Sequence, residues 1–205
     1  TAADKVTQEL FIVPQEMKRT LLAKLLEEYR GSVLVFARTK ANAKKITKGL
    51  RDTGHKAAEI HANRSLGQRR EALEGFKNGR YRILVATDIA ARGIDVKGIE
   101  LVINYDLPDA TDNYVHRIGR TGRAGHTGHA IALATPDQGS DVRDIERLIR
   151  GNLKVSIHPA IPAQRFSGNS ASRPPQYQRN NPQQRGSTHG ASRWKGGGGR
   201  PGRRF

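Results

Sequence analysis

The sequence predicts an α/β protein in which a parallel sheet is covered by helices on both faces. Apolar runs of strand length recur along the first two thirds of the chain, and most of them are continuous rather than alternating. Continuous runs are typical of strands that are buried on both faces. Stretches with a helical pattern separate the runs, and such alternation of strands and helices favours a parallel sheet.

The elements follow one another in a regular order. The strands are predicted at residues 10–13, 32–37, 57–60, 82–86, 99–104 and 129–135. The helices are predicted at residues 16–29, 39–53, 65–78, 111–119 and 140–150. Ligands of such folds bind at the carboxyl edge of the sheet, so the segments that follow the strands are the first place to look for function.

Several residues mark the ends of these helices. Ser65, with Gln68 three residues later, is a capping-box signature for the start of a helix. Gly54, Gly79 and Gly151 stand where helices should stop, because glycine is the usual residue just after a helix.

The charge of the chain predicts a polyanionic partner. Lysine and arginine number 36 against 19 acidic residues, which gives a net charge of +17. Nucleic acid is favoured over a membrane surface because no amphipathic, lipid-facing stripe accompanies the charge. No run of about 18 apolar residues exists to span a bilayer. The absence of cysteine excludes a disulfide scaffold and thiolate metal sites and fits a cytoplasmic protein.

The composition divides the chain into a folded domain at residues 1–162 and a basic tail at residues 163–205. The tail is rich in Gly, Arg, Gln, Asn, Ser and Pro, and such a segment buries too little apolar surface to offset its ordering entropy, so we expect it to be disordered when unbound. Aromatic residues interleaved with arginines suit sequence-tolerant binding to single-stranded RNA. A solvated linker is the alternative. The tail residues expected to contact RNA are Arg173, Tyr177, Arg179, Arg185, Arg193, Trp194, Arg200, Arg203 and Arg204.

Residues 114–125 read Tyr-Val-His-Arg-Ile-Gly-Arg-Thr-Gly-Arg-Ala-Gly. Arg117, Arg120 and Arg123 recur at every third position with glycines between them. Guanidinium groups at this spacing suit the recognition of phosphate, and the glycines let another surface come close. Alternatively, these arginines pair with acids of the same domain.

Residues 85–96 read Val-Ala-Thr-Asp-Ile-Ala-Ala-Arg-Gly-Ile-Asp-Val. A hydroxyl, a carboxylate and bare backbone at the carboxyl end of a strand can hold phosphate oxygens and ribose hydroxyls. Thr87 or Asp88 could equally cap the next helix, and both interpretations can hold together.

These two segments closely resemble motifs of the C-terminal lobe of DEAD-box RNA helicases. The resemblance extends to Val33-Leu-Val-Phe-Ala-Arg-Thr-Lys40 and to residues 60–77, and the order and spacing agree from about residue 5 to residue 160. Within the family the sequence looks most like bacterial RhlE-type members. The resemblance implies a RecA-like fold, ATP and Mg²⁺ as cofactors, and RNA as substrate.

The resemblance also implies roles for single residues. Arg120 and Arg123 match the arginine fingers that reach the γ-phosphate of ATP, and Gly93 and Asp95 match residues that hold the nucleotide. The positions that grip the RNA backbone match Arg38, Thr39, Arg69 and Thr87, whereas Asp88 and His116 match residues that couple the two sites. Arg92 and Arg117 are left open between a structural role and contacts with the other lobe.

The sequence departs from the family pattern at three positions. Ala62 replaces a usual glycine, Leu66 a usual glutamine, and Arg38 a usual asparagine. The first two put the RNA contacts around residues 61–69 in doubt, since a methyl group at position 62 could keep RNA from the backbone. Arg38, in contrast, could add a phosphate contact.

The sequence also lacks features that a complete motor needs. No Gly-Lys dipeptide occurs, which excludes a P-loop, and Asp-Glu-Ala-Asp is absent. The resemblance therefore implies that the Mg²⁺ ligands lie on an N-terminal lobe joined in cis. His126 and His129 make a poor metal site without a third ligand. Alternatives are an RNA-binding module without catalysis and a DNA-translocating relative, and RNA-processing, ribosome-assembly or RNA-decay proteins are possible partners.

Overall fold

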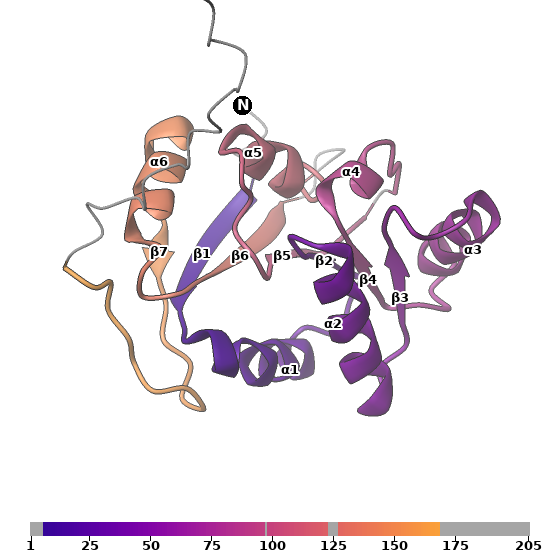
Figure 1. Ribbon diagram of the computed structural model, residues 1–205, viewed down its shortest axis with the longest axis horizontal. Helices are drawn as coiled ribbons and strands as arrows, with labels where there is room; N and C mark the ends of the chain where they lie inside the picture. Colours follow the sequence, from indigo (N-terminus) through magenta and orange to yellow (C-terminus); the bar gives the residue numbers. More distant parts are fainter. Residues whose placement is uncertain (1–5, 97, 123–126, 169–205) are drawn as a thin grey trace, which may run out of the picture. The chain divides into compact units, whose positions relative to one another are not determined.

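A parallel sheet lies at the centre of the protein (Figure 1). The computed structural model describes residues 6–96, 98–122 and 127–168. Within these residues the sheet has seven strands in the order β3-β4-β2-β5-β6-β1-β7, and every neighbouring pair is parallel. The predicted fold class is confirmed.

The strands and helices alternate along the chain. The strands are β1 (Val6–Ile12), β2 (Val33–Phe36), β3 (Ala57–Ile60), β4 (Ile83–Ala86), β5 (Leu101–Asn104), β6 (Gly128–Ala134) and β7 (Lys154–Val155). The helices are α1 (Lys18–Glu28), α2 (Lys40–Asp52), α3 (Leu66–Lys77), α4 (Asp88–Ala91), α5 (Asp112–Ile118) and α6 (Gly139–Ile149), and a 3-10 turn (Gln15–Met17) precedes α1.

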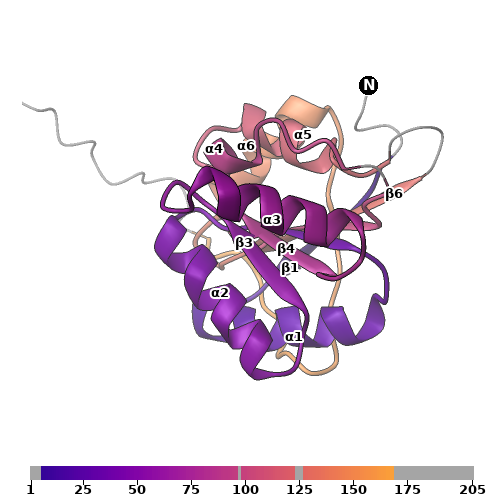
Figure 2. The same ribbon diagram turned by 90° about the vertical axis from the view of Figure 1, so that its right-hand side faces the viewer.

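Helices cover both faces of the sheet, as Figures 1 and 2 show. The helices α1 and α2 pack on one face, and α3, α4, α5 and α6 pack on the other. Every residue of β2, β3, β4 and β5 is buried. This double burial is the reason why these strands have continuous apolar sequences.

Three of the predicted helix boundaries rest on local chemistry that the structure reproduces. The Ser65 hydroxyl accepts a hydrogen bond from the Gln68 backbone N–H, and the Gln68 side chain accepts one from the Ser65 N–H, which completes the capping box. Gly54 and Gly79 have φ angles of +85° and +80°, which residues with a Cβ rarely adopt. Both glycines therefore end helices as predicted.

Other predicted boundaries were wrong. Strand β1 begins at Val6 rather than residue 10, because its polar residues pair with β6 along the whole strand. Helix α6, in contrast, ends at Ile149, within one residue of its predicted end, and the residue after it, Arg150, is left-handed with φ of +53°. The short strand β7 was not predicted, and α4 was anticipated only through the suggestion that Thr87 or Asp88 caps a following helix.

The domain boundary expected at residue 162 stays a prediction. Phe166, which the sequence assigned to the tail, packs against the core beside Gly139. None of the helices within the described residues is both long enough and apolar enough to cross a bilayer.

Gly128 permits a close approach that a side chain would prevent. A Cβ at this position, the first residue of β6, would overlap the Gly122 backbone nitrogen and lie 2.6 Å from the Thr121 hydroxyl oxygen. The same hydroxyl donates a hydrogen bond of 2.6 Å to the Ile99 carbonyl. Gly128 therefore lets the end of the 114–122 segment lie directly against the sheet.

We predict that Gly128→Ala lowers the free energy of unfolding by about 1–3 kcal/mol, because backbone atoms must move to admit the methyl group. Gly67→Ala is the matched control. Gly67 is an exposed helical residue of α3, and a methyl group added there would meet no other atom within 4 Å, so alanine should leave stability unchanged or raise it by up to about 1 kcal/mol. Urea unfolding of both variants is the measurement, and equal stability of the two would contradict the prediction.

Candidate functional site

The residues that the family resemblance assigned to RNA lie after three neighbouring strands. Arg38 and Thr39 follow β2, Thr87 follows β4, and Arg69 lies on α3, which follows β3. Because β3, β4 and β2 are adjacent in a parallel sheet, their carboxyl ends meet at one edge. The fold thus brings these four residues to one end of the sheet.

Arg117 is almost completely buried and joins residues 85–96 to residues 114–125, the two segments with family motifs. Only 1% of its surface is exposed. Its guanidinium group forms a two-pronged ion pair with Asp88, with Nε at 2.6 Å from Oδ1 and Nη2 at 2.7 Å from Oδ2. Of the two roles left open for Arg117, these contacts favour the structural one, because the arginine pairs with an acid of the same domain.

Further contacts of Arg117 reach the middle of the sheet. Its Nη1 donates to the Asn104 side-chain oxygen at 3.0 Å and to the Asp106 carbonyl at 2.6 Å. The guanidinium carbon lies 4.9 Å from the centroid of the Phe36 ring. A single side chain on α5 therefore ties together the carboxyl ends of β2, β4 and β5.

A pocket of about 300 Å³ lies beside this ion pair. Asp88, His116 and Arg120 share it with Arg117, so the two residues expected to couple the sites lie next to one expected arginine finger. The His116 side chain is exposed, whereas Arg120 is half-buried. The remaining lining residues are Phe36, Ala91, Arg92 and Asn113.

Arg120 connects this pocket to the loop that carries Gly93 and Asp95. Its Nη1 donates a hydrogen bond of 2.9 Å to the carbonyl of Ile94, the residue between them. Gly93 has a φ of +81° and shapes the turn, and Asp95 is exposed. The three described residues that the resemblance assigned to ATP therefore lie in one region, although Gly93 and Asp95 do not line the pocket itself.

Three of the four predicted RNA residues already have side-chain partners within the domain. The Thr39 hydroxyl caps α2 by accepting from the Asn42 N–H at 3.1 Å. Arg38 Nε lies 3.3 Å from Asp109 Oδ1, and Arg69 Nη2 donates to the Ala90 carbonyl at 3.4 Å. Thr87 stands directly before α4, but its hydroxyl makes no capping bond.

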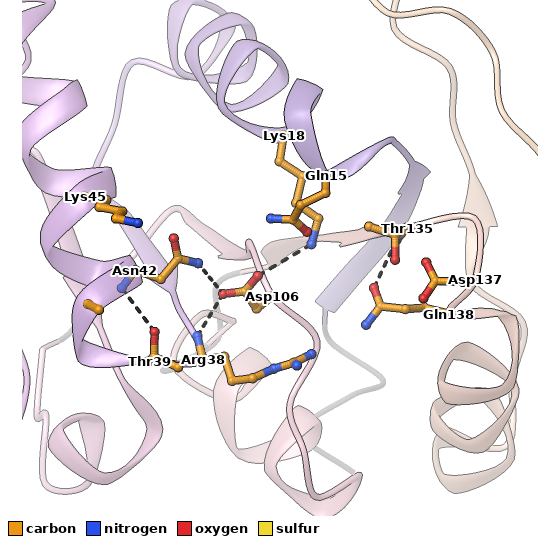
Figure 3. A pocket seen from close by; sticks show the side chains of 11 residues that line it. Gln15, Lys18, Arg38, Thr39, Asn42, Lys45, Asp106, Thr135, Asp137 and Gln138 are labelled. Atoms are coloured by element: carbon orange, nitrogen blue, oxygen red, sulfur yellow. Dashed lines mark hydrogen bonds and ion pairs between the residues drawn. The ribbon is translucent and has the colours of Figure 1, made fainter. Parts of the chain in front are cut away.

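Sequence reasoning missed a second polar centre at the same edge (Figure 3). The Asp106 carboxylate accepts from the Arg38 backbone N–H at 2.9 Å and from Asn42 Nδ2 at 2.7 Å, and it lies 3.6 Å from Lys18 Nζ. Burial lowers the pKa of the Lys18 ammonium, and Asp106 opposes that shift. The only signal in the sequence was an acid two residues after the end of an apolar strand.

Part of the predicted site lies outside the described residues. Arg123, His126 and all the tail residues assigned to RNA belong to this part of the chain. Among the residues that are described, no three His, Cys, Asp or Glu side chains gather in a way that could hold a metal ion. His129 lies 3.1 Å from Glu9 and stacks on the Tyr29 ring.

Comparison with known proteins links this geometry to one family. The family model described as Helicase conserved C-terminal domain matches residues 17–125. The chain is 43% identical over 157 residues to the RNA helicase CrhR of a Synechocystis species, and the aligned region covers 76% of this chain and 32% of the relative. It is 41% identical over 166 residues to the ATP-dependent RNA helicase DBP2 of Lodderomyces elongisporus, over 79% of this chain and 30% of the relative.

Solved structures show the same likeness. The crystal structure of the Escherichia coli DEAD-box protein SrmB, bound to regulator of ribonuclease activity A, matches with a TM-score of 0.74 and 33% identity, over 79% of this chain and 97% of that one. A DEAD box protein from Methanococcus jannaschii matches with a TM-score of 0.72 and 38% identity, over 77% of this chain and 43% of that one. The chain spans about a third of the length of the curated relatives that it matches.

We predict that Arg117→Met lowers the free energy of unfolding by about 3–5 kcal/mol, because it leaves the Asp88 carboxylate without its buried partner. The double variant Arg117→Met, Asp88→Asn should lose less than the sum of the two single losses, since the residues interact directly. Arg92→Met, at an exposed position of the same pocket, is the control and should change stability by no more than about 0.5 kcal/mol. Denaturant unfolding of the unaltered chain, the two single variants, the double variant and Arg92→Met is the measurement, and strict additivity would contradict a shared ion pair.

Proposed function

The chain belongs to the DEAD-box family of RNA helicases, as a C-terminal RecA-like lobe, and from this we propose that it is the second motor lobe of an ATP-dependent RNA helicase. The observation that carries the proposal is the position of Arg120, half-buried against the Ile94 carbonyl beside the pocket of Asp88 and His116. In the proposed cycle ATP and RNA bind across a cleft between two lobes and close it. Hydrolysis and phosphate release open the cleft again.

We propose that Arg120 and Arg123 stabilise the negative charge of the transferring phosphoryl group. Removing an arginine finger generally costs about 10³–10⁵ in rate. The Gly93–Asp95 turn would hold the ribose of ATP. The hydrogen bond from Arg120 to Ile94 supports this, because it holds a guanidinium group next to that turn.

We propose that RNA binds at the carboxyl edge formed by β3, β4 and β2, through the sugar-phosphate backbone. Arg38 and Arg69 supply charge, and Thr87 supplies a hydroxyl that no capping bond occupies. Asp88 directly follows Thr87 in the sequence, and its ion-pair partner Arg117 lies three residues before Arg120. This short path supports a coupling role for Asp88 and His116.

The cofactors follow from the family and not from this chain alone. Mg²⁺ in the complete enzyme would neutralise charge on the ATP phosphates. Because the described residues hold no group of side chains suited to a metal ion, its ligands are proposed on the N-terminal lobe. A cytoplasmic location, and partners in RNA processing, ribosome assembly or RNA decay, stay part of the proposal.

The arginine-finger assignment is tested in a two-lobe protein made by joining this chain to the N-terminal lobe of a relative. We predict that Arg120→Lys lowers RNA-stimulated ATP turnover by about a hundredfold or more, because an ammonium group cannot reproduce the guanidinium fork. RNA binding by the isolated 205-residue chain should barely change. Phosphate release at saturating RNA is the measurement.

Two controls accompany this experiment. Arg147→Lys, at an exposed position of α6 that pairs with Asp144, should keep full turnover. The unaltered 205-residue chain alone should release no phosphate, because it has no P-loop. Normal turnover of the Arg120→Lys protein would remove Arg120 from the active site and favour an RNA-binding module without catalysis.

A separate prediction concerns the tail. Removing residues 169–205, which hold eight lysines and arginines and no acid, should weaken RNA binding and flatten its salt dependence by roughly 0.7 per lost phosphate contact. Truncation after Gly168 keeps Phe166 on the core. Turnover of the two-lobe protein at saturating RNA should stay nearly unchanged. Titrations at several salt concentrations decide the matter, and identical salt slopes would leave the tail a solvated linker.

A further inference from the structure

The outer face of α2 carries a row of lysines, two of which, Lys44 and Lys48, lie beyond the residues that match family motifs. Lys40, Lys44 and Lys48 are spaced four residues apart, so they lie on one face of the helix and about 6 Å apart along its axis. All three are exposed, while the opposite face of α2 packs into the core. We call this the α2 lysine row.

Little negative charge neutralises the row. Lys48 Nζ lies 2.6 Å from Asp52 Oδ2, but these side chains are 76% and 59% exposed. Exposed ion pairs are weak, so Asp52 does not hold Lys48 firmly and a phosphate can replace it. Lys40 Nζ donates to the neutral Asn63 side chain at 3.2 Å. Lys44 has no ion-pair partner among the described residues. Most of the charge therefore remains available to a partner.

The turn after β3 extends the positive surface. In this turn, Nη1 of Arg64 lies 3.6 Å from Oε1 of Glu59, and the Glu59 side chain is only 8% exposed. A buried acid can fix the position of Arg64 but presents almost no negative surface to solvent. The hydrogen bond between Lys40 and Asn63 joins this turn to α2.

The row also lies next to the proposed RNA-binding edge. Helix α2 begins directly after Arg38 and Thr39, two of the proposed RNA residues. Figure 2 shows α2 and α3 on either side of β3, the edge strand of the sheet. The row therefore starts at the proposed RNA edge and runs away from it along the outside of the domain.

We propose that the α2 lysine row, together with Arg64, binds phosphates of RNA that extends past the proposed contacts at Arg38, Thr39, Arg69 and Thr87. The proposal rests on the proposed function, because it lengthens the same RNA path. Phosphate is the expected partner rather than bases, since lysine acts as a point charge and the row contains no aromatic residue on which a base could stack. Binding here is therefore independent of sequence and sensitive to salt.

The test compares RNA of increasing length. The full 205-residue chain and its Lys44→Gln, Lys48→Gln variant are titrated with oligouridylates of about 4 to about 16 nucleotides, the range of single-strand site sizes. Both proteins should bind the shortest RNA equally. For the longest RNA the variant should bind about tenfold more weakly at low salt, and its salt slope should be smaller by roughly 1.4, for two lost contacts.

Matched variants separate a local surface from general charge. Arg147→Gln, Lys154→Gln removes two positive charges near β7, the opposite edge of the sheet, and should keep the affinity for long RNA within about twofold. Lys44→Arg, Lys48→Arg should bind like the unaltered chain, because the positive charge is retained. Circular dichroism of each variant checks that the fold is intact.

The outcomes are distinguishable. Equal losses in both charge-removing variants, or a loss that is the same for short and long RNA, would overturn the lysine row as a distinct surface. If the unaltered chain binds no RNA of any length, both the row and the proposed RNA edge are wrong. If short RNA binds and length adds nothing, the edge survives and the lysine row does not.

Discussion

The ion pair between the buried Arg117 and the partly buried Asp88 holds the carboxyl edge of the sheet in one arrangement. It connects α5 to the end of β4, and the same guanidinium group reaches the end of β5 through Asn104 and the Asp106 carbonyl. An arginine with only 1% of its surface exposed is tolerated only when its charge is paired and hydrogen-bonded. The positions of the site residues on both sides therefore depend on the contacts of this one side chain.

The order of the strands separates the two proposed binding regions. Strands β3, β4 and β2 lie side by side, so the residues after them share one part of the edge, where we propose that RNA binds. Helix α5 follows β5, on the other side of β2, and brings Arg120 to the Gly93–Asp95 turn. Because Thr87 and Asp88 are consecutive, β4 contributes to both regions.

Glycine and buried charge act together in placing Arg120. Gly128 lets Thr121 and Gly122 lie against β6, where the Thr121 hydroxyl bonds to the Ile99 carbonyl. Arg117 fixes the preceding helix, so the segment that holds Arg120 is anchored at both ends. The surface of α2 is organised differently: its lysines are exposed and held by few contacts, which suits a partner bound through long-range charge.

The sequence by itself determined the parallel sheet, because strands that are buried on both faces need continuous apolar residues, and it determined the start of α3, because the capping box of Ser65 and Gln68 is a local interaction. The repeating pattern of arginines could not show which of them is buried, and the family resemblance left the role of Arg117 open. Only the tertiary structure decided that Arg117 is buried, since its partner Asp88 lies 29 residues away. The centre of Asp106 and Lys18 is decided in the same way, because ion pairs between distant segments leave no periodic signal in the chain.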